Sequence, residues 1–250
     1  MLTTERHNLI LSMLTQKQTI KIQEIVEATS ASESTIRRDL TELENLGKLV
    51  RIFGGATVPS RYANEPSVIV KSSKNTQEKV QLAKYAASSI QNGQCIFLDA
   101  GTTINHMIPF LQEKNVIVVT NGLTHMDLLN ELGIQTYMTG GYMKRLTGAL
   151  VGSQAIQSLE SYRFDLCFLG VNGIHATHGY TTPDPEEAAI KKLASSHAQK
   201  TYVVADHTKV NTVSFAKIMD IHDAELIVNE IDNETFESLI KLTDVKVVST

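Results

Sequence analysis

Seven short apolar segments recur along the last two thirds of this 250-residue chain, each four to six residues long. They are QCIFLD, VIVVT, IQTYMT, LCFLG, TYVVAD, ELIVN and KVVS. Helical periodicity fills the spaces between them, as in residues 77–91, where apolar side chains recur at helical spacing. Strands separated by helices indicate an α/β domain with a mostly parallel sheet, which we place at residues 76–250.

The first 57 residues have a different pattern, of three helices followed by a short hairpin. The first helix is expected at residues 5–16, and the second follows the extended segment TIKI. The third helix carries an apolar stripe formed by Ile36, Leu40, Leu43 and Leu46. Ser32 is its predicted N-cap, with Ser30 as the alternative because Ser30 and Glu33 fit a capping box, and Gly47 ends the helix. KLVRIFGGA then alternates and ends in two glycines, which predicts a wing hairpin.

Residues 58–75 separate the two patterns. They contain two prolines and no sustained period, so we expect a linker between domains 1–57 and 76–250. The formal net charge of −4 excludes a protein that is basic throughout, although local basic surfaces remain compatible with it. Cys95 and Cys167 lie in apolar runs and are expected to be buried, reduced thiols. Nothing resembles a signal peptide, and no apolar run nears the roughly 20 residues of a membrane span, so we expect a cytoplasmic protein.

One edge of the third helix is suited to DNA. At about 100° per residue, Ser34, Arg38 and Thr41 point away from the apolar stripe, with Arg37 on the flank. A helix-turn-helix places such a helix in the major groove, where hydroxyls bond phosphates and a guanidinium bridges guanine O6 and N7. The candidate DNA-binding residues are Ser32, Ser34, Thr35, Arg37, Arg38, Thr41, Lys48 and Arg51.

Two observations limit this interpretation. Residues 1–56 contain seven Lys plus Arg and seven Asp plus Glu, so a helical domain with a solvated arginine face is the alternative. Asp39 falls toward the core side of the helix, so we expect it to pair with a nearby cation or cap and not to contact DNA.

The segment TIRRDLTELENLGKLVRIFGGA, preceded by a TSASES turn, resembles the DeoR family of bacterial repressors. The family signature combines TIRRDL in the recognition helix with an R-x-x-GGA wing. Phe53 stands where the family usually has histidine, which puts that one wing contact in doubt. The resemblance implies a winged helix-turn-helix that binds double-stranded operator DNA.

In the larger domain, small polar loops follow the predicted strands. DAGTT, TNG and TGG come first, then LGVNG and ADHTK. Ligands of open α/β sheets bind at the carboxyl ends of strands, and glycine-rich turns and helix N-termini can hold anions. Lys144, Arg145 and Lys209 are the cations expected to face a phosphate. The alternative is that these are ordinary turns with solvated lysines.

Other ligand classes find less support. No G-x-G-x-x-G or Walker-type loop is present, which disfavours a dinucleotide or a nucleoside triphosphate. His175 and His178, with Asp184 nearby, are interpreted as a turn and not as a metal site. We expect neither a metal nor another cofactor.

The loops DAGTT, TNG, TGG, ALVG, GVNG and DHTK also resemble the DeoR-family sensor domain, which is similar in fold to ribose-5-phosphate isomerase and related sugar-phosphate isomerases. By that resemblance a sugar-phosphate site is lined by Asp99, Gly101, Thr102, Thr103, Asn121, Gly140, Gly141 and Lys209.

Together these features predict a repressor of a sugar uptake or catabolism operon that a phosphorylated sugar releases from DNA. The chain is most similar to fructose-operon repressors of Gram-positive bacteria, which implies fructose 1-phosphate, with tagatose 6-phosphate or another ketose phosphate as alternatives. An activator would present the same reading helix. An active isomerase with a DNA-binding appendage is a further alternative, with Asp99 as base and Glu186 or Glu187 assisting. Paired half-sites need paired readers, so we expect a homo-oligomer, a dimer or a tetramer.

Overall fold

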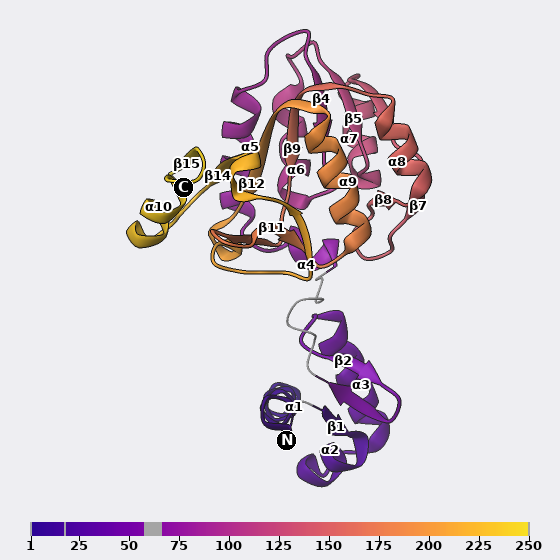
Figure 1. Ribbon diagram of the computed structural model, residues 1–250. Coiled ribbons are helices and arrows are strands. Elements are labelled where there is room, and N and C mark those ends of the chain that lie inside the picture. The colour runs from indigo at the N-terminus through magenta and orange to yellow at the C-terminus, as the bar shows by residue number, and fades with distance from the viewer. Residues whose placement is uncertain (1, 18, 58–66, 250) are drawn as a thin grey trace. The chain divides into compact units, whose positions relative to one another are not determined.

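The computed structural model describes residues 2–17, 19–57 and 67–249. The chain divides into two compact units, Met1–Val70 and Lys71–Thr250, which are described separately (Figure 1). Within the described residues, no helix has both the length and the apolar character that a membrane crossing requires.

The N-terminal unit is a winged helix-turn-helix. Its elements are α1 (Thr3–Lys17), β1 (Thr19–Lys21), α2 (Ile22–Thr29), α3 (Glu33–Asn45), β2 (Val50–Ile52) and β3 (Gly55–Thr57). The three strands form an antiparallel sheet in the order β1-β3-β2, so the extended segment TIKI joins the wing. The three helices bury one apolar core, centred on Ile10, Leu14, Ile25, Ile36, Leu40 and Leu43.

The ends of α3 follow from its sequence. The Ser32 hydroxyl accepts a hydrogen bond from the Thr35 backbone N–H at 3.3 Å, which confirms Ser32 as the N-cap. Gly47 has φ = 68° and the Lys48 N–H reaches back to the Leu43 carbonyl, which ends the helix as expected. The expected apolar stripe is wrong at one position. Leu46 is 45% exposed, because it caps the helix after the last turn that faces the core.

The larger unit is an α/β domain. Its main sheet is formed by β4 (Cys95–Leu98), β5 (Ile117–Thr120), β6 (Gln135–Met138), β9 (Phe164–Leu169), β12 (Ala198–Ala205), β14 (Glu225–Val228) and β15 (Val245–Val247). These are the seven predicted segments, and their order is β15-β14-β12-β9-β4-β5-β6. All six strand pairings are parallel, which confirms the predicted sheet.

Helices cover both faces of this sheet (Figure 1). They are α5 (Thr76–Ser88), α6 (Thr102–Asn105), α7 (Met126–Glu131), α8 (Ser153–Glu160), α9 (Pro185–Ser196) and α10 (Asn233–Leu239), with short 3-10 turns at Ile108–Leu111, Leu123–His125, His207–Lys209 and Ile221–Asp223. Alternate side chains of β4 enter different cores. Phe97 packs in the core with residues of α8 and α9, whereas Ile96 and Leu98 pack with residues of α5 and α6.

Two smaller sheets were not predicted. β10 (Gly173–His175), β11 (Gly179–Thr182) and β13 (Ala216–Met219) form an antiparallel sheet, and β7 (Tyr142–Met143) pairs with β8 (Leu150–Val151). The predicted linker, residues 58–75, overlaps the short helix α4 (Val68–Ser72), whereas residues 58–66 of it lie outside the described residues. Both cysteines are free, as expected. Cys167 is buried but Cys95 is only half-buried, because it begins its strand.

Candidate functional sites

The exposed edge of α3 carries two arginines in different states. The Arg37 guanidinium is held by Glu33 one turn earlier, at 2.5 Å. Arg38 is exposed, and its guanidinium makes no hydrogen bond or ion pair with any described residue. A guanidinium without a protein partner keeps its full donor set for a base edge. The structure therefore singles out Arg38 among the candidate DNA contacts.

The remaining candidates connect the helix to its cap and to the wing. The Ser32 hydroxyl lies 2.9 Å from the Ser34 hydroxyl and 2.8 Å from that of Thr35. Thr41 donates to the Arg37 carbonyl and accepts a hydrogen bond from Arg51 at 2.9 Å, which ties β2 to the helix. Lys48 is exposed at the start of the wing.

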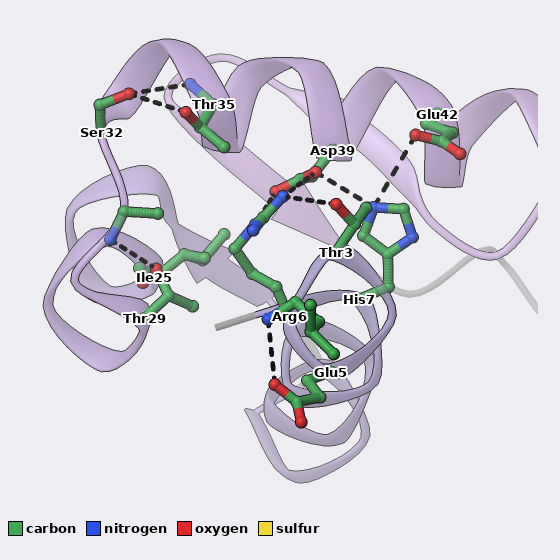
Figure 2. A network of polar contacts seen from close by, with 12 residues as sticks. Thr3, Glu5, Arg6, His7, Ile25, Thr29, Ser32, Thr35, Asp39 and Glu42 are labelled. Atoms are coloured by element: carbon green, nitrogen blue, oxygen red, sulfur yellow. Dashed lines mark hydrogen bonds and ion pairs between the residues drawn. The ribbon is translucent and has the colours of Figure 1, made fainter.

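A buried ion pair joins the reading helix to α1 (Figure 2). Arg6 donates from Nε and Nη2 to the two carboxylate oxygens of Asp39, at 2.5 and 2.9 Å, and His7 Nε2 lies 3.1 Å from the same carboxylate. Arg6 and Asp39 are 8% and 3% exposed. The expectation that Asp39 pairs with a cation is confirmed. Local sequence patterns do not indicate which cation pairs with Asp39, since Arg6 lies 33 residues earlier in the chain.

In the larger unit, buried polar residues line the carboxyl edge of the main sheet. Each directly follows a strand: they are Asp99, Asn121, Thr139, Asp206 and Asn229. Strand order reverses between β4 and β9. The chain proceeds from β4 through β5 to β6 on one side of this point, and from β9 through β12 and β14 to β15 on the other. A reversal of this kind is where open α/β sheets bind ligands.

Asp99 lies at the reversal point. Its carboxylate accepts hydrogen bonds from Lys191 of α9, at 2.5 Å, and from the Gly170 backbone N–H, at 3.0 Å. The loops after β4 and β9 approach closely, since a Cβ on Gly101 would lie 3.6 Å from the Gly170 Cα. Thr102 and Thr103 form the first turn of α6 beside them. Lys191 was not among the predicted cations, because it lies within a helix and not in a strand-end loop.

The Asn121 side chain links the loop after β4 to β8 through two hydrogen bonds. Its side-chain oxygen accepts from the Ala100 N–H at 3.1 Å, and its nitrogen donates to the Leu150 carbonyl at 3.3 Å. Next to Asn121, the Thr120 hydroxyl is hydrogen-bonded to His125 Nδ1. Burial lowers the pKa of His125 to about 4. Gly122 has no room for a side chain, since a Cβ would lie 2.8 Å from the His125 ring. The TNG loop is therefore held firmly against the edge of the sheet.

The TGG loop and its cations are placed differently from the expectation. Gly141 has φ = 107°, and a Cβ there would lie 2.2 Å from the Val151 carbonyl oxygen, so only glycine fits, whereas Gly140 has ordinary van der Waals room. The Lys144 ammonium forms an ion pair with Asp184, the N-cap of α9. Arg145 is exposed and makes no hydrogen bond or ion pair with a described residue.

Lys209 belongs to the same edge as Asp99. It follows β12, donates to the Thr208 hydroxyl at 2.8 Å and lies 3.6 Å from the buried Asp206 carboxylate. Burial raises the pKa of Asp206, but Lys209 and the hydrogen bonds from Thr208 lower it more, so the net pKa is below its ordinary value. Asp206 is therefore an anion that holds Lys209 at the carboxyl edge.

Groups of possible metal ligands are few in the part of the chain that the structure describes. His175 accepts hydrogen bonds from the Thr177 and His178 N–H groups, the geometry of a turn, and Asp184 caps α9. Asp220, His222 and Asp223 lie close together, but all three are exposed, and nothing further points to an ion there.

A winged helix-turn-helix joined to an α/β domain with a polar switch point defines a ligand-responsive DNA-binding regulator. Residues 6–62 match the DeoR-like helix-turn-helix domain, and residues 74–230 match the DeoR C terminal sensor domain. The chain belongs to the DeoR family of transcriptional regulators, and it is not an enzyme.

Three relatives cover nearly all of the chain. The uncharacterized HTH-type transcriptional regulator FruR of Bacillus subtilis is 46% identical over 249 residues, 99% of each chain. A putative aga operon transcriptional repressor of Escherichia coli O157:H7 is 36% identical, over 90% of this chain and 86% of its own. The lactose phosphotransferase system repressor of Staphylococcus aureus is 34% identical, over 96% of this chain and 98% of its own.

Among solved structures, ribose 5-phosphate isomerase A of Methanocaldococcus jannaschii is similar over 55% of each chain. The TM-score is 0.42 and the sequence identity is 19%.

Proposed function

We propose that this regulator represses an operon for the uptake or catabolism of a sugar, and that a phosphorylated sugar releases it from the operator. The observation that carries the proposal is the switch point of the sensor domain, where Asp99 is buried beside two closely packed glycine loops. Carboxylates bind sugar hydroxyls, and the Lys209 ammonium at the same edge suits a phosphate. The relatives named for the aga operon and for the lactose phosphotransferase system support a sugar as the signal.

Fructose 1-phosphate is the effector that we propose first, and tagatose 6-phosphate is second. The similarity to FruR, at 46% over the whole chain, favours the fructose ester. The predicted effector-binding residues differ in how close they lie to the switch point. Asp99, Gly101, Thr102, Thr103 and Lys209 lie at the switch point or beside it, Asn121, Gly140 and Gly141 shape neighbouring loops, and Lys144 is engaged by Asp184. The protein acts as a dimer or tetramer, because one small reading helix offers few base contacts.

A thermal-shift screen of sugar phosphates tests the effector half of this proposal. A ligand that binds the folded state stabilises it by RT ln(1 + [L]/Kd), about 2.7 kcal/mol at 100 times Kd. We expect fructose 1-phosphate to raise the Tm, unphosphorylated fructose to leave it unchanged, and Lys209→Gln to reduce the shift. The matched control is Lys217→Gln. Lys217 is an exposed lysine of β13 that pairs with Asp220. A panel in which no sugar phosphate shifts the Tm contradicts the proposal.

A further inference from the structure

The tip of the wing carries the most exposed large apolar side chain in the part of the chain that the structure describes. Phe53 and Gly54 form the two-residue turn between β2 and β3, and Ile52 pairs with Gly55 to close it. The Phe53 side chain is fully exposed. A single exposed apolar side chain is common on protein surfaces, so its meaning depends on how the tip is held and on what lies beside it.

The wing tip is fixed to the body of the DNA-binding domain. Gly54 has φ = 78°, a conformation that glycine adopts without strain, and its carbonyl accepts a hydrogen bond from the Ile22 N–H at 2.9 Å. Gly55 packs directly on β1, since a Cβ there would lie 2.1 Å from the Ile20 carbonyl oxygen. Phe53 therefore projects from a preorganised turn, and a partner that covers it pays little to order the backbone.

The wing is also joined to the exposed edge of α3. The Arg51 backbone N–H donates to Glu44 at 2.8 Å, and its guanidinium donates to the Thr41 hydroxyl at 2.9 Å. The face of β2 that carries the Arg51 side chain therefore lies beside the edge of α3 suited to DNA. Side chains two positions apart along a strand project to the same face, and Phe53 comes two positions after Arg51. Phe53 thus continues the DNA-binding surface.

The charge of the wing matches a nucleic acid. Residues 46–57 contain Lys48 and Arg51 and no acidic residue, whereas residues 1–56 as a whole are balanced in charge. With α3 in the major groove, a phosphate strand lies next to the helix, and the minor groove lies beyond that strand. Cations bind the phosphates, and an apolar tip is suited to the stacked bases. A basic hairpin with an apolar tip fits this arrangement of charge and apolar surface.

We propose that Phe53 inserts as an apolar wedge between base pairs of the minor groove beside the α3 site, and that the operator is bent at this step. Wedges of this kind partly unstack a base step and kink the duplex by about 20–90°. Pyrimidine–purine steps, TA and CA/TG, unstack most easily. The wing thereby selects for the flexibility of one base step, in addition to the base edges that α3 contacts. The inference concerns the operator alone, so it is independent of the identity of the effector.

The variant Phe53→Ala tests the wedge in the full-length protein, on an operator duplex that the intact protein has selected from a random pool. We expect the operator Kd to rise about tenfold or more, within the range for loss of an aromatic contact to bases, and the bend to be lost. The bend is measured by energy transfer between dyes at the two ends of the duplex. Phe53→Leu should keep most of the affinity and of the bend, because leucine also acts as a wedge.

Two controls separate the wedge from a general defect. The Tm of Phe53→Ala should match that of the wild type, because the side chain is fully exposed. Phe215→Ala removes an exposed phenylalanine of the sensor domain, and this variant should bind and bend the operator as the wild type does.

Salt and base sequence supply readouts that a simple loss of affinity would not move. A wedge releases no counterion, so Phe53→Ala should leave the slope of log Kd against log salt unchanged, whereas Lys48→Gln should reduce that slope by about one. Replacing the TA or CA step under the wing by a stiff AA step should weaken wild-type binding. The same replacement should have little further effect in Phe53→Ala.

Three results would overturn the inference. They are wild-type operator affinity in Phe53→Ala, a wild-type complex in which the operator is straight, and an AA step that weakens the wild type and Phe53→Ala equally. Sedimentation without DNA adds a fourth: if Phe53→Ala changes the self-association of the protein and leaves the bend intact, Phe53 contacts a second copy of this chain and not DNA.

Discussion

Arg38→Ala is expected to weaken binding to the operator about 5- to 150-fold, the equivalent of the roughly 1–3 kcal/mol carried by one bidentate contact to a base. Arg38 is exposed on α3 and its side chain makes no hydrogen bond or ion pair with a described residue, so the substitution should remove the proposed DNA contact without disturbing the fold. The measurement is fluorescence anisotropy at fixed salt, on a duplex that the intact protein has selected from a random pool.

Arg37→Ala is the matched control for Arg38→Ala. Arg37 is one position along the same helix, but Glu33 already holds its guanidinium. It should lose less operator affinity than Arg38→Ala does. The thermal shift with fructose 1-phosphate should be the same in both variants. If Arg38→Ala binds the operator as tightly as the wild type, or if it loses effector binding too, Arg38 is not the base-reading residue.

Asp39→Asn is expected to lower the Tm of the N-terminal domain by more than about 5 °C, because it leaves the buried Arg6 guanidinium without its anion. The pair also fixes the reading helix against α1, so operator affinity should fall even at temperatures where the variant is folded. Glu33→Gln, which breaks the exposed pair on the same helix, should shift the Tm by less than about 2 °C.

The same pair predicts a pH dependence. Burial raises the pKa of Asp39, but the hydrogen bonds and charges of Arg6 and His7 lower it more, so the pKa in the folded protein is below its ordinary value of 3.8. The stabilisation is therefore complete above that ordinary value and is lost as the pH falls through the lower, folded-state pKa. Asp39→Asn should lose less stability on acidification than the wild type. A variant whose Tm and acid dependence match the wild type contradicts a stabilising pair.

The sequence predicted the main sheet well, because its strands are short, mainly apolar runs and the five inner strands are mostly buried, whereas the edge strands β6 and β15 are partly exposed. The antiparallel strands β10, β11 and β13 were missed. Their sequences, GIH, GYTT and AKIM, are too short and too mixed to show a period, and they form through pairing with distant segments. The position of α3 and its cap followed from local signals at Ser32 and Gly47.

The candidate binding edge and Lys209 could be predicted from the loops that follow the strands, but the lysine that pairs with Asp99 could not. Lys191 is in the middle of a helical pattern, where a lysine ordinarily faces water. Only the packing of α9 against the sheet brings the Lys191 ammonium to Asp99 at the carboxyl edge. Lys144 shows the opposite case, since its place after a glycine loop suggested a phosphate ligand, and the fold pairs it with Asp184. Contacts between residues 40 to 92 positions apart have no local signal.

The central claim is that a phosphorylated sugar releases this regulator from DNA, and an operator titration tests it most directly. The selected duplex is held with the full-length protein at fixed salt while fructose 1-phosphate, tagatose 6-phosphate or unphosphorylated fructose is added. We predict that fructose 1-phosphate raises the operator Kd about tenfold or more, within the usual range of allosteric coupling, and that fructose has no effect. An operator Kd that no sugar phosphate changes, with binding still sensitive to Arg38→Ala, would contradict the claim.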